Sequence, residues 1–445
     1  MLNKLFFYMP VFIQNLIISI YNSWLYNQRH SGVYKERLEF YSNYRDMSNK
    51  EIEDYIKHKL SSFLRYSKEK SKWYSKYNSA KNLQDFPILT KYDLMDNLSE
   101  IQTISDNQGI VSKTGGTTGA SMKVVYTKED MQERFAVLDS FRAQYGYKLG
   151  IKTAWFSGKD LVNRKDISAG RFYKDDIFNK IRFFSTFHIN EDNFYHYWRA
   201  LEKYGARFVV GFPSSVFEIC IIAKERGLRL SNKVDVFFPT AENVLPIHRD
   251  VISEVLGCKI VDQYASSEGA PFILECKFGH KHMNLLTGVF EVVDDDLKPS
   301  SEGEMLVTSF TTHGTPLIRY KIGDRVKLAK NNSCLCGSSF PIVEELEGRT
   351  TDYILSPTYG KVNLGNISNS TKSVKGIKRF QVIQESKNNL IVNVESGPIF
   401  NEEEQKKFER ALESRFGDMI IDVVKVQHIK REASGKFRIV KRLVD

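Results

Sequence analysis

Apolar and polar positions alternate along the middle of the chain in a pattern that predicts helices and strands in turn. Residues 49–70 carry apolar side chains at the three- and four-residue spacing of an amphipathic helix. Apolar runs at 207–211 and 234–238 indicate buried strands, and segments 191–204 and 245–256 indicate helices. This rhythm is typical of a largely parallel sheet with helices on both faces.

Ligands of such sheets bind beyond the carboxyl ends of the strands. The segments that follow predicted strands are therefore the candidate binding loops: 211–214, 239–242 and 262–268. At the end of the first of them, Pro213, Ser214 and the following Ser215 predict a turn.

Beyond Gly269 the pattern changes to short strands joined by turns, which predicts a small antiparallel subdomain. The expected strands are 289–293, 303–309, 317–318 and 325–328.

A polar break at 348–352 separates this region from a compact α+β unit. The unit is expected to hold strands 380–384, 390–394 and 423–428 and helix 402–416. We predict an α/β protein whose N-terminal domain, residues 1–350, has mostly parallel sheets flanked by helices plus the antiparallel subdomain. Residues 351–445 are predicted to form a separate C-terminal domain.

The first 25 residues are rich in apolar side chains, but polar residues such as Gln14 and Asn15 interrupt them. A membrane-spanning helix needs about 20 mostly apolar residues. We therefore expect an amphipathic helix packed on the body, with peripheral membrane contact as an open alternative.

The net charge of +10 is spread along the 445 residues, so it fits anionic cofactors or an anionic membrane as well as nucleic acid. We recognise no RNA-reading motif or zinc finger of standard spacing, and nucleic acid is not an expected partner. Five cysteines are an odd, sparse set, which favours a reducing compartment and hence the cytoplasm.

Residues 112–123, with the sequence SKTGGTTGASMK, form the strongest candidate for a binding loop. Glycines allow backbone N–H groups to approach an anion closely, and hydroxyl groups and a lysine add donors. The spacing matches neither the P-loop nor the dinucleotide fingerprint. A phosphate site and a flexible surface turn are both open interpretations of this loop alone.

Together with later motifs, however, this loop resembles a known set in a known order, that of the adenylate-forming enzymes. The set comprises Gly115-Gly116-Thr117-Thr118-Gly119, Tyr264-x-x-x-Glu268, Tyr320-x-x-Gly323-Asp324, Gly348-Arg349-x-x-Asp352 and Ser434-Gly435-Lys436. One branch, the phenylacetate–coenzyme A ligase-like proteins found with capsular polysaccharide biosynthesis, is similar in more detail. The segments that carry this likeness are the Thr-Gly-Gly-Thr-Thr-Gly form at 114–119 and residues 187–189, 211–215 and 316–320.

The resemblance implies an ATP-dependent ligase that uses Mg²⁺ and has a mobile C-terminal domain. A carboxylate attacks the α-phosphate of ATP to give an acyl-adenylate and pyrophosphate, and an acceptor then takes the acyl group. The expected partners are a small-molecule carboxylate and an acceptor that is coenzyme A, a carrier or a sugar amine. The alternative is a catalytically inactive nucleotide-binding or membrane-associated protein of the same fold.

The resemblance also implies a role for each matched residue. Residues expected to contact the β- and γ-phosphates, through backbone or side chain, are Thr114, Gly115, Gly116, Thr117, Thr118, Gly119 and Lys123. Residues expected around adenine and ribose are Thr240, Ala241, Glu242, Tyr264 and Asp324. Glu268 would hold Mg²⁺, Arg349 would contact phosphate or ribose, and Lys436 would stabilise charge during adenylation.

Each of these residues also has an ordinary structural interpretation. A carboxylate such as Glu268 is usually a solvated loop residue, and Gly-Asp pairs such as that of Asp324 are common in turns. Tyr264 as a core side chain and Lys436 as one cation of a basic tail are the matching alternatives.

One segment of the chain holds Cys276 close to His280 and His282, and a second loop holds Cys334 and Cys336. Together these side chains are a donor set that suits tetrahedral zinc. The Cys-x-Cys spacing is tighter than in a standard finger, and free buried thiols are the rival interpretation. Some members of the branch carry a comparable pattern, and His282 is preferred over His280 only on that resemblance. The expected metal is structural.

Overall fold

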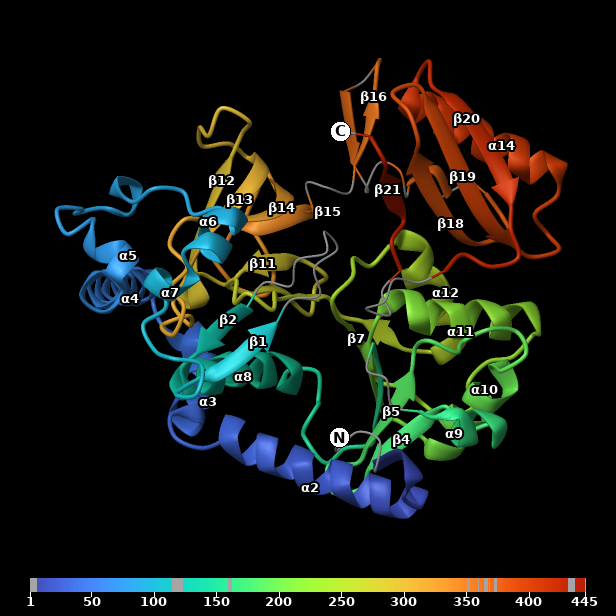
Figure 1. The fold of residues 1–445 in the computed structure, drawn as a ribbon, viewed down its shortest axis with the longest axis horizontal. Coiled ribbons are helices and arrows are strands. Elements are labelled where there is room, and N and C mark those ends of the chain that lie inside the picture. The colour runs from blue at the N-terminus through green and yellow to red at the C-terminus, as the bar shows by residue number, and fades with distance from the viewer. Residues whose placement is uncertain are drawn as a thin grey trace. The chain divides into compact units, whose positions relative to one another are not determined.

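The computed structural model describes residues 6–113, 123–158, 162–349, 353–358, 360–363, 367, 369–371, 374–430 and 437–444. The chain divides into two compact units (Figure 1). Unit 1 holds residues 1–19, 150–260 and 347–445, and unit 2 holds residues 20–149 and 261–346.

Unit 1 is built on a six-stranded sheet in the order β4-β5-β3-β6-β7-β8. Its strands are β3 (Thr153–Ser157), β4 (Tyr173–Asp176), β5 (Ile181–Ser185), β6 (Phe208–Gly211), β7 (Val236–Pro239) and β8 (Lys259–Ile260). All neighbours pair in parallel except β4, which is antiparallel to β5. Every residue of β6 and β7 is buried, as expected for parallel strands covered on both faces.

Four helices follow strands of this sheet: α9 (Arg164–Ser168), α10 (Phe194–Tyr204), α11 (Pro213–Glu225) and α12 (Pro246–Leu256). Their apolar sides join the strands in one core. The parallel α/β arrangement expected from the sequence is confirmed. The turn expected at 213–215 is wrong, because Pro213 opens α11, where its missing N–H and fixed φ suit the first turn.

The C-terminal part of unit 1 contains the hairpin β16 (Tyr353–Ser356) and β17 (Gly360–Asn363) and a four-stranded sheet in the order β20-β19-β18-β21. The sheet consists of β18 (Ile377–Gln384), β19 (Asn389–Ser396), β20 (Ile420–Lys425) and β21 (Val440–Arg442), with α14 (Glu402–Phe416) packed on it. The helix agrees with its prediction. The strand expected at 423–428 begins three residues earlier, because β20 pairs with β19 from Ile420 onward.

Unit 2 contains helix α8 (Lys128–Ala143) and several helices that precede it in the chain. They are α3 (Tyr34–Asn43), α4 (Asn49–Lys70), α5 (Lys72–Ser75), α6 (Lys91–Asp96) and α7 (Leu98–Ile101). The predicted helix at 49–70 is confirmed as α4, and Ser48 and Glu51 form a capping box at its start.

A seven-stranded sheet of unit 2 has the order β12-β13-β14-β15-β11-β10-β9. Its strands are β9 (Gln263–Tyr264), β10 (Ile273–Glu275), β11 (Lys281–Met283), β12 (Gly288–Val293), β13 (Glu302–Ser309), β14 (Tyr320–Leu328) and β15 (Ile342–Arg349). Two expectations are corrected here. Residues 317–318 are a buried loop, because Arg319 has φ +47° and β14 starts only after it. Gly348 and Arg349 end β15 instead of lying in a break.

Helix α2 (Val11–Arg29) contains residues of both units: residues 11–19 belong to unit 1 and residues 20–29 to unit 2. The helix predicted in the first 25 residues is thus present. Among the described residues, no helix combines the length and the hydropathy that crossing a bilayer requires.

Candidate functional site

The phosphate-loop candidate connects two paired strands of unit 2. Strands β1 (Ile110–Lys113) and β2 (Lys123–Tyr126) are antiparallel, with Ser112 opposite Val124 and Lys113 opposite Lys123. The Lys123 ammonium lies 2.7 Å from the Asp106 carboxylate. The predicted residues Thr114, Gly115, Gly116, Thr117, Thr118 and Gly119 lie outside the described residues.

Tyr264 and Asp324, the predicted adenine and ribose contacts, are direct partners. The Tyr264 hydroxyl donates to Asp324 Oδ2 at 2.6 Å. Tyr264 lies in β9 and Asp324 in β14, which are at separate places in the sheet order. The tertiary structure therefore brings together two residues that are 60 positions apart.

A bulge in β14 presents Asp324. Arg325 pairs with Glu304 and Lys321 with Leu306, so residues 322–324 face only Met305 on β13. Gly323 supplies the positive φ, +84°, that this detour requires. Bulges of this kind redirect a side chain, and they are common beside active sites. The Gly-Asp pair is thus part of a bulged strand instead of an ordinary turn.

The loop that carries Glu268 is fixed at its backbone on either side of that residue. Ser267 O accepts hydrogen bonds from Ser112 Oγ at 3.1 Å and from the Tyr126 hydroxyl at 2.9 Å. Arg134 Nη1, which is buried, donates to the carbonyls of Gly269 and Ala270. These contacts connect both strands that flank the candidate phosphate loop to the predicted magnesium-binding segment.

The negative charge of Glu268 affects the pKa of Tyr126 in strand β2. The pKa of Tyr126 is raised to about 12, mainly by burial, with further contributions that include the negative charge of Glu268. Glu268 itself is half-buried. The carboxylate therefore lies close enough to the hairpin to act on a group within it.

In unit 1, the segment after β7 has a strained backbone and a capping carboxylate. Ala241 has φ +63°, which is uncommon for a residue with a side chain, and Thr240 N donates to Gly211 O. Glu242 accepts hydrogen bonds from Ser214 N and Ser214 Oγ, both at 3.0 Å, at the start of α11. Negative charge at a helix N-terminus is favourable, because it satisfies unpaired N–H groups there.

Glu242 also binds Phe437, the residue that follows the predicted lysine motif. Phe437 N donates to Glu242 Oε1 at 3.1 Å. The Arg379 guanidinium lies 5.2 Å from the centre of the Phe437 ring and forms an ion pair with Glu218, and both charged partners are buried. Lys436 lies outside the described residues, but its neighbour in sequence is attached to the turn expected to border adenine.

The predicted nucleotide residues thus fall into two sets. Lys123, Tyr264, Glu268 and Asp324 belong to unit 2, and Thr240, Ala241 and Glu242 belong to unit 1. Arg349 is the last residue of β15, and its side chain is not among those described. The sequence interpretation missed Arg134 and Arg379, although a charged residue on a buried helix face, as Arg134 is, was a readable signal.

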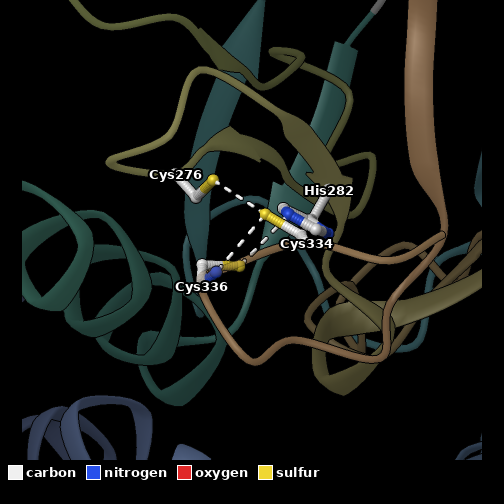
Figure 2. Close-up of side chains that lie close together, drawn as sticks. All are labelled: Cys276, His282, Cys334 and Cys336. Carbon is white, nitrogen blue, oxygen red and sulfur yellow. Dashed lines mark hydrogen bonds between the residues drawn. The ribbon is translucent and has the colours of Figure 1, made fainter.

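The second candidate centre is a cluster of Cys276, His282, Cys334 and Cys336 in unit 2 (Figure 2). One donor atom from each residue lies within 4.8 Å of every other. Cys276 Sγ is 3.6 Å from Cys334 Sγ, and Cys336 Sγ is 3.4 Å from His282 Nε2. Zinc bonds of about 2.3 Å to sulfur and about 2.0 Å to nitrogen give tetrahedral edges of roughly 3.5–3.8 Å. The donors therefore fit one zinc ion.

The orientation of His282 also fits a metal ligand. Its Nδ1 lies 3.0 Å from Phe340 O, and an N–H at Nδ1 leaves the Nε2 lone pair facing the sulfur atoms. His280 is exposed, and its Nδ1 lies 3.2 Å from Cys334 Sγ. His280 is therefore suited to donate a hydrogen bond to a thiolate from outside the cluster.

The thiols of Cys334 and Cys336 differ in pKa when no metal is bound. Burial acts to raise the pKa of Cys334, but hydrogen bonds from Cys336 N and His280 outweigh it and lower the pKa to about 6. Burial raises the pKa of Cys336 to about 11. One thiolate among several thiols is a starting point for binding a soft divalent cation, which displaces the remaining protons.

Comparisons with known proteins agree with this architecture. The model of the CapK C-terminal domain family matches residues 354–443. Protein CapK of Staphylococcus aureus is 30% identical over 435 residues, which cover 94% of this chain and 94% of that protein. A 2-hydroxyisobutyryl-CoA ligase in the postadenylation state in complex with R3-HIB-AMP has a TM-score of 0.71 at 17% identity, covering 89% of this chain and 90% of its own.

A second solved structure is more distant. The anthranilate CoA ligase AuaEII in complex with anthranoyl-AMP has a TM-score of 0.51 at 12% identity, covering 74% of this chain and 64% of its own. At these identities the structural likeness concerns the fold, which is that of adenylate-forming ligases.

Proposed function

The chain belongs to the CapK family of adenylate-forming enzymes, and from this membership we propose that it activates a carboxylate with ATP and then transfers the acyl group. The acceptor is coenzyme A or another thiol or amine. The CapK relationship supports a place in surface polysaccharide biosynthesis. The solved ligases bound to acyl-AMP support the same chemistry.

In the first step a carboxylate oxygen bonds to the α-phosphorus of ATP. The bond from that phosphorus to the oxygen bridging to the β-phosphate breaks, and pyrophosphate leaves. In the second step the thiol or amine bonds to the acyl carbon, loses its proton, and displaces AMP. The first step needs positive groups beside phosphate oxygens, because an anion attacks a polyanion.

The residues of the chain divide this work. The Tyr264 ring would stack on adenine, and Asp324 would accept hydrogen bonds from the ribose hydroxyls. Lys123 would leave its ion pair with Asp106 and bind a phosphate oxygen of ATP. Glu268 would hold Mg²⁺, which offsets phosphate charge. Lys436 would stabilise charge at the α-phosphate during adenylation, and a rotation of the C-terminal domain would then withdraw it.

The observation that carries this proposal is the pairing of Tyr264 with Asp324. Two motif residues predicted to hold one nucleoside touch each other at 2.6 Å although they come from different strands. A bulge presents one of them, and the neighbouring loop is bonded to both strands that flank residues 114–122. An ordinary turn or a solvated loop would need none of these contacts.

Carboxylate-dependent exchange of labelled pyrophosphate into ATP tests the proposal, with a panel of aliphatic, aromatic and hydroxy acids. We expect exchange with at least one acid and its loss in Lys436→Ala. Lys430→Ala, an exposed lysine of the same basic tail, is the matched control and should retain exchange. ATP binding without exchange across the panel would favour the inactive nucleotide-binding alternative.

We also propose that Cys276, His282, Cys334 and Cys336 hold one structural zinc ion. All four ligands come from the protein, so no position is left open for catalysis. The ion would fasten β10 and β11 to the segment before β15. Metal analysis should find about one zinc per chain in the wild type and in His280→Ala. His282→Ala should bind zinc at least about tenfold more weakly. Equal loss in both variants would refute this ligand set.

A further inference from the structure

Helix α2 has its polar and apolar sides reversed compared with an ordinary surface helix. Its buried side carries polar residues, with Gln14 and Ser19 both at 1% exposure or less. Asn15 Oδ1 accepts a hydrogen bond from Asp175 N at 3.2 Å, and Ser19 Oγ accepts one from Ile177 N at 2.8 Å. Polar side chains therefore attach the first half of the helix to strand β4 and the turn after it.

The outer side of α2 is apolar. Its exposed residues recur at four-residue spacing in two adjacent rows, which places them on one face. This apolar face consists of Phe12, Leu16, Ile20 and Trp24 in one row and Ile17 and Tyr21 in the other. Between 39% and 69% of each side chain is exposed. A surface helix normally shows the reverse pattern, so the face is built for an apolar environment.

The turn after β4 extends this apolar surface. Ile177 and Phe178 are both more than half exposed, and Ile177 is the residue whose N–H is bonded to Ser19. The hydrogen bond from Ile177 N to Ser19 Oγ therefore holds this turn beside α2, which carries exposed apolar groups of its own.

The charges around this surface favour an anionic partner. Of the 19 residues of α2, only Arg29 is charged. The exposed Lys180 follows the β4 turn, and its carbonyl accepts from Thr153 N, which sets the exposed Lys152 beside it. The nearest acidic groups are engaged: Asp175 pairs with Arg182, and Asp176 accepts from Asn179 N.

We propose that the apolar face of α2, with Ile177 and Phe178, lies in the headgroup region of an anionic lipid bilayer. Aromatic residues such as Tyr21 and Trp24 prefer this interface, and basic residues beside it gain from anionic lipid. The helix would lie on the membrane without crossing it, in line with its modest hydropathy. A second copy of the chain is a poorer occupant, because it would set the same basic residues against each other.

Flotation of the full-length protein with vesicles tests this proposal. We expect binding to phosphatidylcholine vesicles containing about one third phosphatidylglycerol, weaker binding to phosphatidylcholine alone, and reduction by salt. Ile20→Ser with Trp24→Ser should lower the partition coefficient at least about tenfold, because two exposed apolar side chains lose their contact with lipid. Tyr92→Ser with Ile420→Ser, at sites elsewhere that are even more exposed, should bind as the wild type does.

Acrylamide quenching of tryptophan fluorescence gives a second measurement, since Trp24 is the strongly exposed tryptophan of the four. Anionic vesicles should protect it from quenching. The proposal fails if the wild type binds neither vesicle or if the α2 double variant, with an unchanged circular dichroism spectrum, binds as well as the wild type. It also fails if sedimentation velocity shows a dimer that the double variant abolishes. None of these results depends on the ligase activity.

Discussion

Acidification should destabilise unit 1 through one buried histidine. His248 lies in the first turn of α12, and its ring is 4.9 Å from that of Phe217. Its Nδ1 accepts a hydrogen bond from Leu245 N at 3.3 Å. It lines a small cavity with Arg379 and Phe437. Burial first and the Arg379 charge second lower the pKa of His248 from 6.5 to about 3.

The sign of the effect follows from this pKa. Above about pH 7 the imidazole is neutral in both the folded and the unfolded chain, and it has no effect on stability. As the pH falls below 6.5 the unfolded chain takes up a proton, whereas the folded chain resists until about pH 3. Stability is therefore lost progressively over that range. Between about pH 7 and about pH 4.5 the loss from this residue alone is about 2.5 kcal/mol.

Hydrogen exchange of peptides from α12 measures this loss without requiring two-state unfolding of the whole chain. Other groups also titrate, so the informative quantity is the difference between the wild type and His248→Gln, whose amide oxygen can still accept from Leu245 N. The opening free energy of the wild type should fall by about 2.5 kcal/mol more than that of the variant. His58→Gln, at an exposed site on α4, should follow the wild type. Parallel profiles for the wild type and His248→Gln would refute a buried neutral imidazole.

Three further predictions concern the sites. Tyr264→Phe should weaken ATP binding about three- to tenfold, because Asp324 loses a hydrogen-bond donor, and calorimetric titration measures it. Glu242→Gln should slow adenylation about tenfold or more while leaving ATP binding within about twofold, because Phe437 N, next to Lys436 in sequence, loses a charged acceptor. Pyrophosphate exchange measures adenylation, and calorimetric titration measures ATP binding. Cobalt added to the metal-free protein should give thiolate charge-transfer absorption, and its absence would remove the cysteine cluster as a metal site.

The sequence by itself determined the elements whose signals are local. The amphipathic spacing of α4, its Ser48 cap and the fully apolar strands β6 and β7 are legible without neighbours, because periodicity and capping depend on a few consecutive residues. The five ordered motifs named the family and nominated Tyr264, Glu268 and Asp324. The cysteine spacing nominated a metal cluster but could not choose between two histidines.

Tertiary structure alone decided which of these residues meet. The hydrogen bond between Tyr264 and Asp324, the attachment of Phe437 to Glu242 and the carbonyl that orients His282 all join residues at least 58 positions apart. The sequence predicts an amphipathic helix packed on the body but not which side of the helix makes that contact, and in the structure the polar side makes it. Helical periodicity gives the existence of a face but not its direction. That direction depends on hydrogen bonds offered by a distant strand, which only the folded chain supplies.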